Sequence, residues 1–341
     1  SFTITNIMYD ITLPVFTNII PSTASYCNSP DISYEVNESL QSGSLTWIYG
    51  WRKEFIYQFK KVDLSPGEHV LENVLPQDVL IENRENNLII EGIDIAGNYS
   101  RLELSNIIFD KTPPELIIKS PVTGNILNTL EFTYKISERL NEGQIICNQT
   151  GGKFDENSPR IILLTGADLE QRRKSEIVPG LDDQLQSNSV YDIQLTGIDL
   201  AGNISKSNII SDVMFDNKDP EITILSPLEN EILFDPSISF ILSENLKEGK
   251  VIWKKLDKGS GSWNPFRFFI SLFSFLSSNV ISVDLTGEEL NIGNHIKLRL
   301  DNQSKLKIGK VYSLTIQGID FAGNVGNSET IQRIQIVNHH E

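Results

Sequence analysis

The chain has little of what enzymes and zinc-binding domains commonly use. Its 341 residues include two cysteines, two methionines and four histidines. Two cysteines cannot supply a four-cysteine zinc site or a disulfide framework. Four histidines, two of them in the terminal His339–His340 pair, leave few side chains for proton transfer or for activating a nucleophile. The composition disfavours catalysis, and we expect a protein that is not an enzyme.

Positive charge and long apolar runs are also scarce. No apolar stretch reaches the roughly 20 residues that cross a bilayer, so we expect no membrane insertion. The net charge of −16 argues against a nucleic-acid partner, whose phosphates require a basic face. The same charge suits a soluble chain, or carboxylates that are held together by cations. The first ten residues, SFTITNIMYD, have neither the basic start nor the apolar core of a secretory leader.

Internal repetition is the strongest signal that is present. The segment GIDIAGN at 92–98 returns as GIDLAGN at 197–203 and as GIDFAGN at 318–324. Three other markers precede it in a fixed order: YDITLP, FDKTPP or FDNKDP; then NESL, SERL or SENL; then VDLSPGE, ILLTGAD or VDLTGEE. Four markers that recur in one order predict a tandem array.

The markers also set the boundaries of the units. TNIMYD, at the start, matches SNIIFD and SDVMFD at the ends of the first two units, and RIQIVN closes the third. We therefore expect the natural chain to continue in at least one direction. The predicted units are 1–10, the last strand of a preceding repeat or a linker; 11–110, repeat one; 111–216, repeat two; and 217–338, repeat three.

Alternating apolar residues predict strands in each unit. One strand has the inward row Ile32, Tyr34 and Val36, and a later strand has Leu88 and Ile90. Helical periodicity is scarce, and each unit has the size of an immunoglobulin-like sandwich. The predicted fold class is all-β: three tandem Ig-like β-sandwiches that form an elongated array.

The register explains several single residues. Trp47, Cys147 and Trp253 share one position, just after a glycine that we interpret as a turn (Gly43, Gly143, Gly249). Cys27 aligns with Leu127 and Leu233, so both cysteines are predicted to be core residues rather than a disulfide pair. Tyr191 and Tyr312 stand where a tyrosine corner would form, and Asn86 breaks this pattern in repeat one.

The four markers together resemble the bacterial Ig-like repeats of very large cell-surface and secreted proteins, including adhesins. The resemblance covers about residues 10–338. It implies an extracellular stalk, an adhesin or a surface-structure segment, with other repeats of a longer chain as its neighbours. It implies no single activity, because such repeats do not share one.

Each apolar row is predicted to end in a carboxylate. The early strand continues by parity to Glu38, and the later strand continues to Asp94. In an Ig-like topology these two strands belong to opposite sheets and end at one pole, where the linker residue Asp10 also enters. The predicted metal ligands, including one asparagine in each unit, are Asp10, Glu38, Asp94 and Asn98; Asp110, Glu138, Asp199 and Asn203; and Asp216, Glu244, Asp320 and Asn324.

Two interpretations of these residues are open. Like charges at close range require a counter-ion or a raised pKa, and carboxylate and amide oxygens are the ligands that Ca²⁺ takes. Alternatively, Asp and Asn on either side of Ala-Gly or a similar pair form a tight turn by binding their own backbone. We expect either a calcium ion or this turn, with hydrogen bonds at the pole.

Repeat three alone has an insertion of 15 residues, around 262–279. Its apolar residues are spaced as in a short helix, although a hairpin is also compatible. A large exposed apolar element indicates an interface, either between copies of the chain or within it. The predicted interaction residues are Phe266, Phe268, Phe269, Ile270, Phe273 and Phe275.

The leading functional hypothesis is a structural or adhesive segment of a bacterial extracellular surface protein, stiffened by calcium and self-assembling through the insertion. A second hypothesis is a binding module for a carbohydrate or a host protein. A third is a set of accessory domains of a larger extracellular enzyme. Contacts of the insertion would separate the first two, and the flanking sequence would identify the third.

Overall fold

The computed structural model describes residues 9–177, 185–256, 279–299 and 305–338. The described residues form β-strands and short 3₁₀ turns, without an α-helix among them. The insertion around 262–279 lies outside these ranges except for its last residue, and all of the predicted interaction residues, Phe266 to Phe275, fall outside them. Within them we find no helix with the length and hydrophobicity of a membrane span.

Repeat one is a sandwich of two sheets. Its strands are β1 (Phe16–Ile20), β2 (Tyr26–Cys27), β3 (Ile32–Val36), β4 (Leu40–Tyr49), β5 (Lys53–Gln58), β6 (Gly67–Leu71), β7 (Glu85–Asp94) and β8 (Tyr99–Phe109). One sheet has the order β1-β3-β6 and the other β2-β8-β7-β4-β5, in which β2 runs parallel to β8. The early and later strands of the sequence prediction, β3 and β7, lie in opposite sheets as expected.

Repeat two has the same plan. Its strands are β9 (Leu116–Ser120), β10 (Ile126–Leu127), β11 (Phe132–Ile136), β12 (Leu140–Gly152), β13 (Arg160–Leu163), β14 (Arg172–Ile177), β15 (Ser189–Asp199), β16 (Ile204–Lys206) and β17 (Ile210–Phe215). The sheets have the orders β14-β11-β9 and β10-β17-β15-β12-β13, and β16 pairs with β15.

Repeat three repeats this arrangement. Its strands are β18 (Ile222–Ser226), β19 (Ile232–Leu233), β20 (Ile238–Leu242), β21 (Glu248–Lys255), β22 (Val280–Asp284), β23 (Gly293–Leu298), β24 (Val311–Ile319), β25 (Val325–Asn327) and β26 (Ile331–Ile336). The sheets have the orders β18-β20-β23 and β19-β26-β24-β21-β22, and β25 pairs with β24. The prediction of three tandem Ig-like sandwiches is confirmed.

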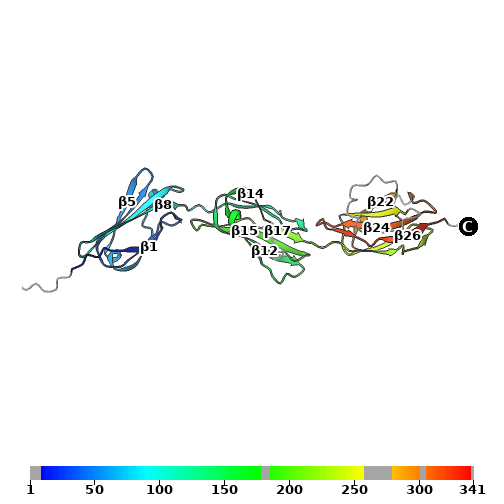
Figure 1. Ribbon diagram of the computed structural model, residues 1–341, viewed down its shortest axis with the longest axis horizontal. Helices are drawn as coiled ribbons and strands as arrows, with labels where there is room; N and C mark the ends of the chain where they lie inside the picture. Colours follow the sequence, from blue (N-terminus) through cyan, green and yellow to red (C-terminus); the bar gives the residue numbers. More distant parts are fainter. Residues whose placement is uncertain (1–8, 178–184, 257–278, 300–304, 339–341) are drawn as a thin grey trace, which may run out of the picture.

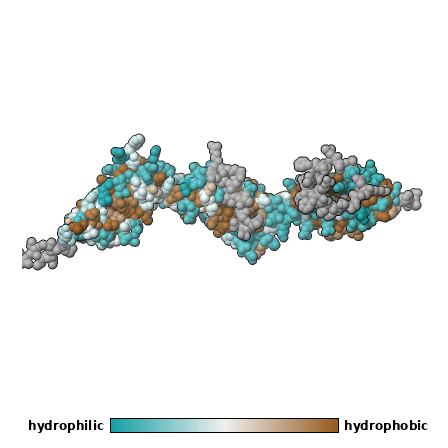
Figure 2. Space-filling model, in the orientation of Figure 1, coloured by the Kyte–Doolittle hydropathy of each residue, from teal (hydrophilic) through white to brown (hydrophobic). Residues whose placement is uncertain are grey.

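The three sandwiches follow one another in a line (Figure 1). Asp110 lies in the short segment between β8 and β9, and Asp216 lies between β17 and β18. Each repeat has a hydrophobic core of its own. On the outside, apolar and polar residues are interspersed over the visible face of all three repeats (Figure 2).

The core residues occupy the positions that the register predicts. Trp47, Cys147 and Trp253 are fully buried. Cys27 is partly buried against the core of repeat one, and neither cysteine is in a disulfide. Burial raises the pKa of the Cys147 thiol to about 12, so this side chain behaves as a small apolar group.

The tyrosine corner also forms where expected. The hydroxyl oxygens of Tyr191 and Tyr312 accept hydrogen bonds from the backbone N–H groups of Gln186 and Lys307, each five residues upstream. Asn86 replaces this residue in repeat one and instead donates its amide hydrogens to the carbonyls of Arg84 and Ile107.

The predicted glycine turn before the central core residue is wrong. Gly43, Gly143 and Gly249 lie inside β4, β12 and β21 rather than in turns. Each stands directly opposite the glycine of the GID marker, and Gly143, for example, pairs with Gly197. A Cβ on Gly143 would lie 2.8 Å from Leu164 Cδ1. The glycine is therefore required by close packing and not by a change of chain direction.

Candidate functional site

Three carboxylates meet at the N-terminal pole of every repeat. One comes from the linker, one from the segment after the first core strand, and one from the end of the later core strand. In each repeat, one oxygen of each carboxylate lies within 4.8 Å of the others. The clusters are Asp10, Glu38 and Asp94; Asp110, Glu138 and Asp199; and Asp216, Glu244 and Asp320. The carboxylates that strand alternation predicted at one pole are thus close together in space.

The linker aspartate belongs to two repeats at once. The backbone N–H of Asp110 donates to Cys27 O of repeat one, at 2.9 Å. Its backbone carbonyl accepts from the Asn203 amide of repeat two at 2.9 Å, and its side chain enters the repeat-two cluster. Asp216 repeats these contacts, with Leu127 O and Asn324 as its partners. At each junction one residue therefore bonds to both repeats.

The linker is also held by the residue that precedes each glutamate. Ser137 Oγ accepts a hydrogen bond from the backbone N–H of Glu115, at 2.8 Å. Asn37 and Ser243 do the same for Val15 and Glu221. This contact explains why Ser or Asn comes before Glu in the second marker: the first residue secures the linker, and the second reaches the cluster.

The aspartate of the GID marker organises a tight turn. Oδ1 of Asp199 accepts from the backbone N–H groups of Ala201 and Asn203, both at 2.8 Å. Asp94 and Asp320 make the corresponding bond to Asn98 and Asn324. The turn that the sequence allowed is present in all three repeats. The other oxygen, Asp199 Oδ2, accepts one hydrogen bond, from Asn203 Nδ2, and retains a lone pair, so the turn and a cation are compatible.

The asparagine has the opposite orientation to that expected of a metal ligand. Nδ2 of Asn203 donates to Asp199 Oδ2 at 2.8 Å and to the Asp110 carbonyl at 2.9 Å. Both partners are acceptors, so the nitrogen must face them and the amide oxygen faces away from the carboxylates. Asn98 and Asn324 share this orientation. The expectation that these amide oxygens coordinate an ion is corrected: the asparagines act as donors.

Packing accounts for the glycine of the GID marker. A Cβ on Gly197 would lie 2.7 Å from Leu140 Cδ1, and one on Gly318 would lie 2.6 Å from Leu246 Cδ1. These leucines end the SERL and SENL markers. The second and fourth markers therefore recur together because they pack against each other at the pole.

The glutamate of each cluster has a raised pKa. Burial and the nearby charges of Asp216 and Asp320 raise the pKa of Glu244 to about 7. Burial and the adjacent aspartates raise the pKa values of Glu38 and Glu138 in the same way. Ion pairs such as Arg160–Asp155 and Arg101–Glu91 lie elsewhere. Each cluster thus favours the uptake of a proton or a cation.

In repeat one, the aspartates differ from the glutamate because hydrogen bonds stabilise their ionised form. Burial acts to raise the pKa of Asp94, but hydrogen bonds from Asn98, Gly97 and Ala96 outweigh it and the pKa is lowered. The side-chain and backbone hydrogen bonds from Thr12 lower the pKa of Asp10. In repeat one, two carboxylates are thereby held ionised beside a third that resists ionisation.

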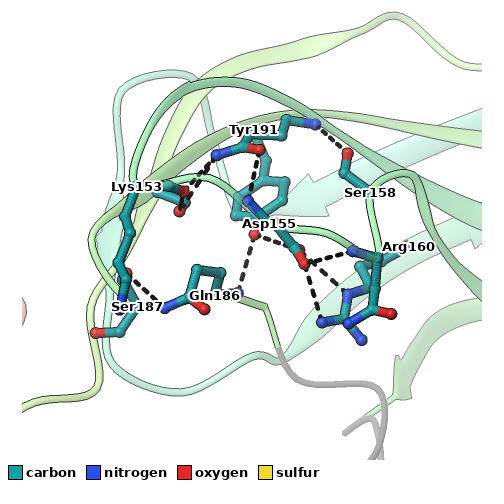
Figure 3. Close-up of polar contacts among 10 residues, drawn as sticks. Lys153, Asp155, Ser158, Arg160, Gln186, Ser187 and Tyr191 are labelled. Atoms are coloured by element: carbon teal, nitrogen blue, oxygen red, sulfur yellow. Dashed lines mark hydrogen bonds and ion pairs between the residues drawn. The ribbon is translucent and has the colours of Figure 1, made fainter.

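Sequence reasoning missed a second polar cluster, which lies in repeat two (Figure 3). Asp155 is 3% exposed, and Arg160 binds both of its carboxylate oxygens at 3.1 Å. The hydroxyl of Tyr191 donates to Asp155 Oδ2 at 2.7 Å. The cluster fixes the loop between β12 and β13 against the sandwich. The segment DENSPR occurs only in this repeat, so repetition gave no signal for it.

Comparisons with known proteins find similarity only at the level of structure. No family model matches, and no curated protein matches at the level applied. A solved structure of a bacterial ice-binding adhesin is 10% identical, with a TM-score of 0.31, over 97% of this chain and 100% of that chain. A tetra-tandem repeat from the extending region of a large adhesion protein is 12% identical, with a TM-score of 0.28, over 94% and 74%.

A third solved structure holds fibronectin type III-like modules of the Clostridium thermocellum protein CbhA. It is 10% identical to this chain, with a TM-score of 0.34, over 59% of this chain and 94% of that chain. Likeness at this distance describes general architecture and says nothing of activity.

Proposed function

We propose that this chain is a non-catalytic, extracellular structural segment of a bacterial surface protein, in which a calcium ion at each junction stiffens a row of Ig-like repeats. The observation that carries the proposal is the threefold recurrence of one carboxylate cluster at the pole where each linker enters. A cluster that occurred once would have many explanations, whereas one that recurs with the same contacts indicates a requirement of the array.

The donor set favours calcium over zinc or copper. Each cluster offers a hard oxygen from each of three carboxylates, all within 4.8 Å of one another. Ca²⁺ takes about six to eight oxygen ligands with flexible geometry, and waters or backbone carbonyls would supply the rest. Zinc and copper would favour the nitrogen or sulfur ligands that the clusters lack. The raised pKa values of Glu138 and Glu244 indicate charge that a divalent cation would neutralise.

Stiffening would follow from the position of the linker aspartate. Asp110 is bonded through its N–H to repeat one and through its carbonyl to repeat two. A cation bound by its side chain, together with Glu138 and Asp199, would restrict the backbone rotations that permit bending. The cation would have a structural role rather than a catalytic one.

Small-angle X-ray scattering of the full chain, in calcium and after chelation, tests this function. We expect chelation to reduce the maximum dimension and to broaden the distribution of shapes. A variant with Glu38→Gln, Glu138→Gln and Glu244→Gln should resemble the chelated protein in both buffers. A matched control replaces the exposed residues Glu131, Glu229 and Glu288 with Gln and should respond as the wild type does. Identical scattering with and without calcium would refute the stiffening role.

A further inference from the structure

A contact across the first junction involves no carboxylate. Asn28 follows β2 of repeat one, and its Nδ2 donates to Asn203 Oδ1 of repeat two at 3.1 Å. This is the amide oxygen that faces away from the cluster. The residue beside Asn28, Cys27, accepts the backbone N–H of Asp110. Two adjacent residues of repeat one therefore hold the linker and the following turn.

The second junction has the same plan. Asn128 follows β10, as Asn28 follows β2, and adjacent Leu127 accepts the backbone N–H of Asp216. Nδ2 of Asn28 lies 3.6 Å from the position that a Cβ on Gly202 would take, and Nδ2 of Asn128 lies 3.6 Å from that of Gly323. Both asparagines thus sit on the Ala-Gly-Asn turn of the next repeat.

Burial at the pole reflects this docking. Asn203 and Asn324, which have a preceding repeat in the structure, are 9% and 8% exposed, and Asp110 and Asp216 are 5% exposed. Asn98 and Asp10 are at the equivalent pole of repeat one and are not buried to this extent. At both junctions within the structure, the turn is thus covered by the preceding repeat.

We propose that Asn28 and Asn128 are positioning residues that dock on the Ala-Gly-Asn turn of the following repeat and set the orientation across each junction. The chemistry is complementary in one direction only: the end of one repeat supplies an amide donor, and the turn of the next supplies an amide oxygen and a glycine without a side chain. The partner of this surface is an Ig-like repeat that carries the Ala-Gly-Asn turn.

Repeat three shows that the docking residue is not a general feature of the fold. The residue after β19, at the position of Asn28 and Asn128, is Phe234. Its side chain has no hydrogen-bond donor. By this rule the end of repeat three does not fit an Ala-Gly-Asn turn, so the order of repeats is encoded at one position. The rule involves no metal, so it can be tested independently of the calcium proposal.

Residual dipolar couplings of the full chain, measured in calcium and in chelator, test the proposal. Asn28→Asp keeps the side-chain shape but replaces the donor with an acceptor that opposes Asn203 Oδ1, and Asn28→Ala removes the donor without adding charge. We expect both variants to lose the common alignment of repeats one and two, in each buffer where the wild type has it. Repeats two and three should stay aligned, and chemical shifts in the core of repeat one should not change.

Asn128→Asp is the matched control at the other junction and should reverse this pattern. Three results would overturn the proposal. They are a wild type without common alignment in either buffer, Asn28 variants that retain it, and Asn28 variants that disturb both junctions equally.

Discussion

At the scale of single residues, the linker aspartate explains why the pole is sensitive to charge. Asp216 is buried, its side chain accepts hydrogen bonds from Ser187 and Lys218, and its carboxylate lies beside Glu244. The negative charges of Asp216 and Asp320, together with burial, raise the pKa of the neighbouring Glu244. Substituting the glutamate therefore tests the field without disturbing the linker.

Without calcium, the stability of repeat three should fall as pH rises. The folded pKa of Glu244, about 7, lies above its ordinary value of 4.5, so the folded state binds the proton more tightly. The stabilisation is full below the ordinary value and is lost as pH rises through the folded value. Hydrogen exchange of β24 amides in chelator should show this decline, and Glu244→Gln should abolish it.

Exposed Glu248 on the same repeat provides the control, because Glu248→Gln should preserve the decline. A wild type whose β24 protection is constant from pH 5 to pH 8, after correction for intrinsic exchange, would contradict the electrostatic account of the cluster.

The buried Asn203 should contribute measurably to the stability of repeat two. Asn203→Ala removes the donors to the Asp110 carbonyl and to Asp199 Oδ2 and leaves both acceptors without this partner. Losing such partners costs about 1–3 kcal/mol. We expect a loss of that order in the free energy of unfolding of repeat two, measured by hydrogen exchange. Asn148→Ala, an exposed site on β12, should change it by less than about 0.5 kcal/mol.

Sequence reasoning reached the position of these residues but not the orientation of their atoms. Alternation along a strand places Glu138 and Asp199 at one pole, because parity and topology alone decide that. Which end of the Asn203 amide faces Asp199 depends on the linker carbonyl nearby, and no spacing reveals it. Gly43 was mistaken for a turn because its cross-strand partner, Gly92, is known only from the register. The 100-residue spacing of Asn28 and Asn128 marks them as equivalent positions in the sequence. It does not reveal that Asn28 contacts Asn203 in the next repeat.

At the scale of elements, the β12–β13 hairpin of repeat two contains one buried ion pair, between Arg160 and Asp155. Burial acts to raise the pKa of Asp155, but hydrogen bonds from Arg160 and Tyr191 outweigh it and lower the pKa. The loop therefore depends on its arginine. The counterpart β4–β5 hairpin of repeat one closes through the short Gly50–Trp51–Arg52 tip between Tyr49 and Lys53.

Arg160→Met should strongly destabilise this hairpin. It leaves the buried Asp155 carboxylate without its cation, a change that typically costs about 3–5 kcal/mol. Arg139→Met removes a pair with Glu170 whose side chains are 61% and 45% exposed and should cost at most about 1 kcal/mol. Chemical denaturation followed by amide signals of repeat two measures both. Equal effects of the two substitutions would show that the buried pair has no special role.

At the scale of the whole molecule, the chain has three separate cores joined by short junctions. Each repeat buries its own apolar side chains, so the array is not held straight by a shared core. Its geometry must come from the junctions, where Asp110 and Asp216 connect the hydrogen bonds of two repeats. The net charge of −16 adds self-repulsion, which cations at the clusters would reduce.

Calcium binding to the full chain, measured by isothermal titration calorimetry, tests the central claim most directly. The account predicts one calcium ion for each cluster, and the loss of one equivalent in Glu138→Gln, while the exposed-site control Glu131→Gln retains them all. Binding should release protons near pH 7, because the raised pKa of Glu244 leaves part of this carboxyl protonated before the metal enters. A titration without binding, or a Glu138→Gln variant that binds as much calcium as the wild type, would contradict the account.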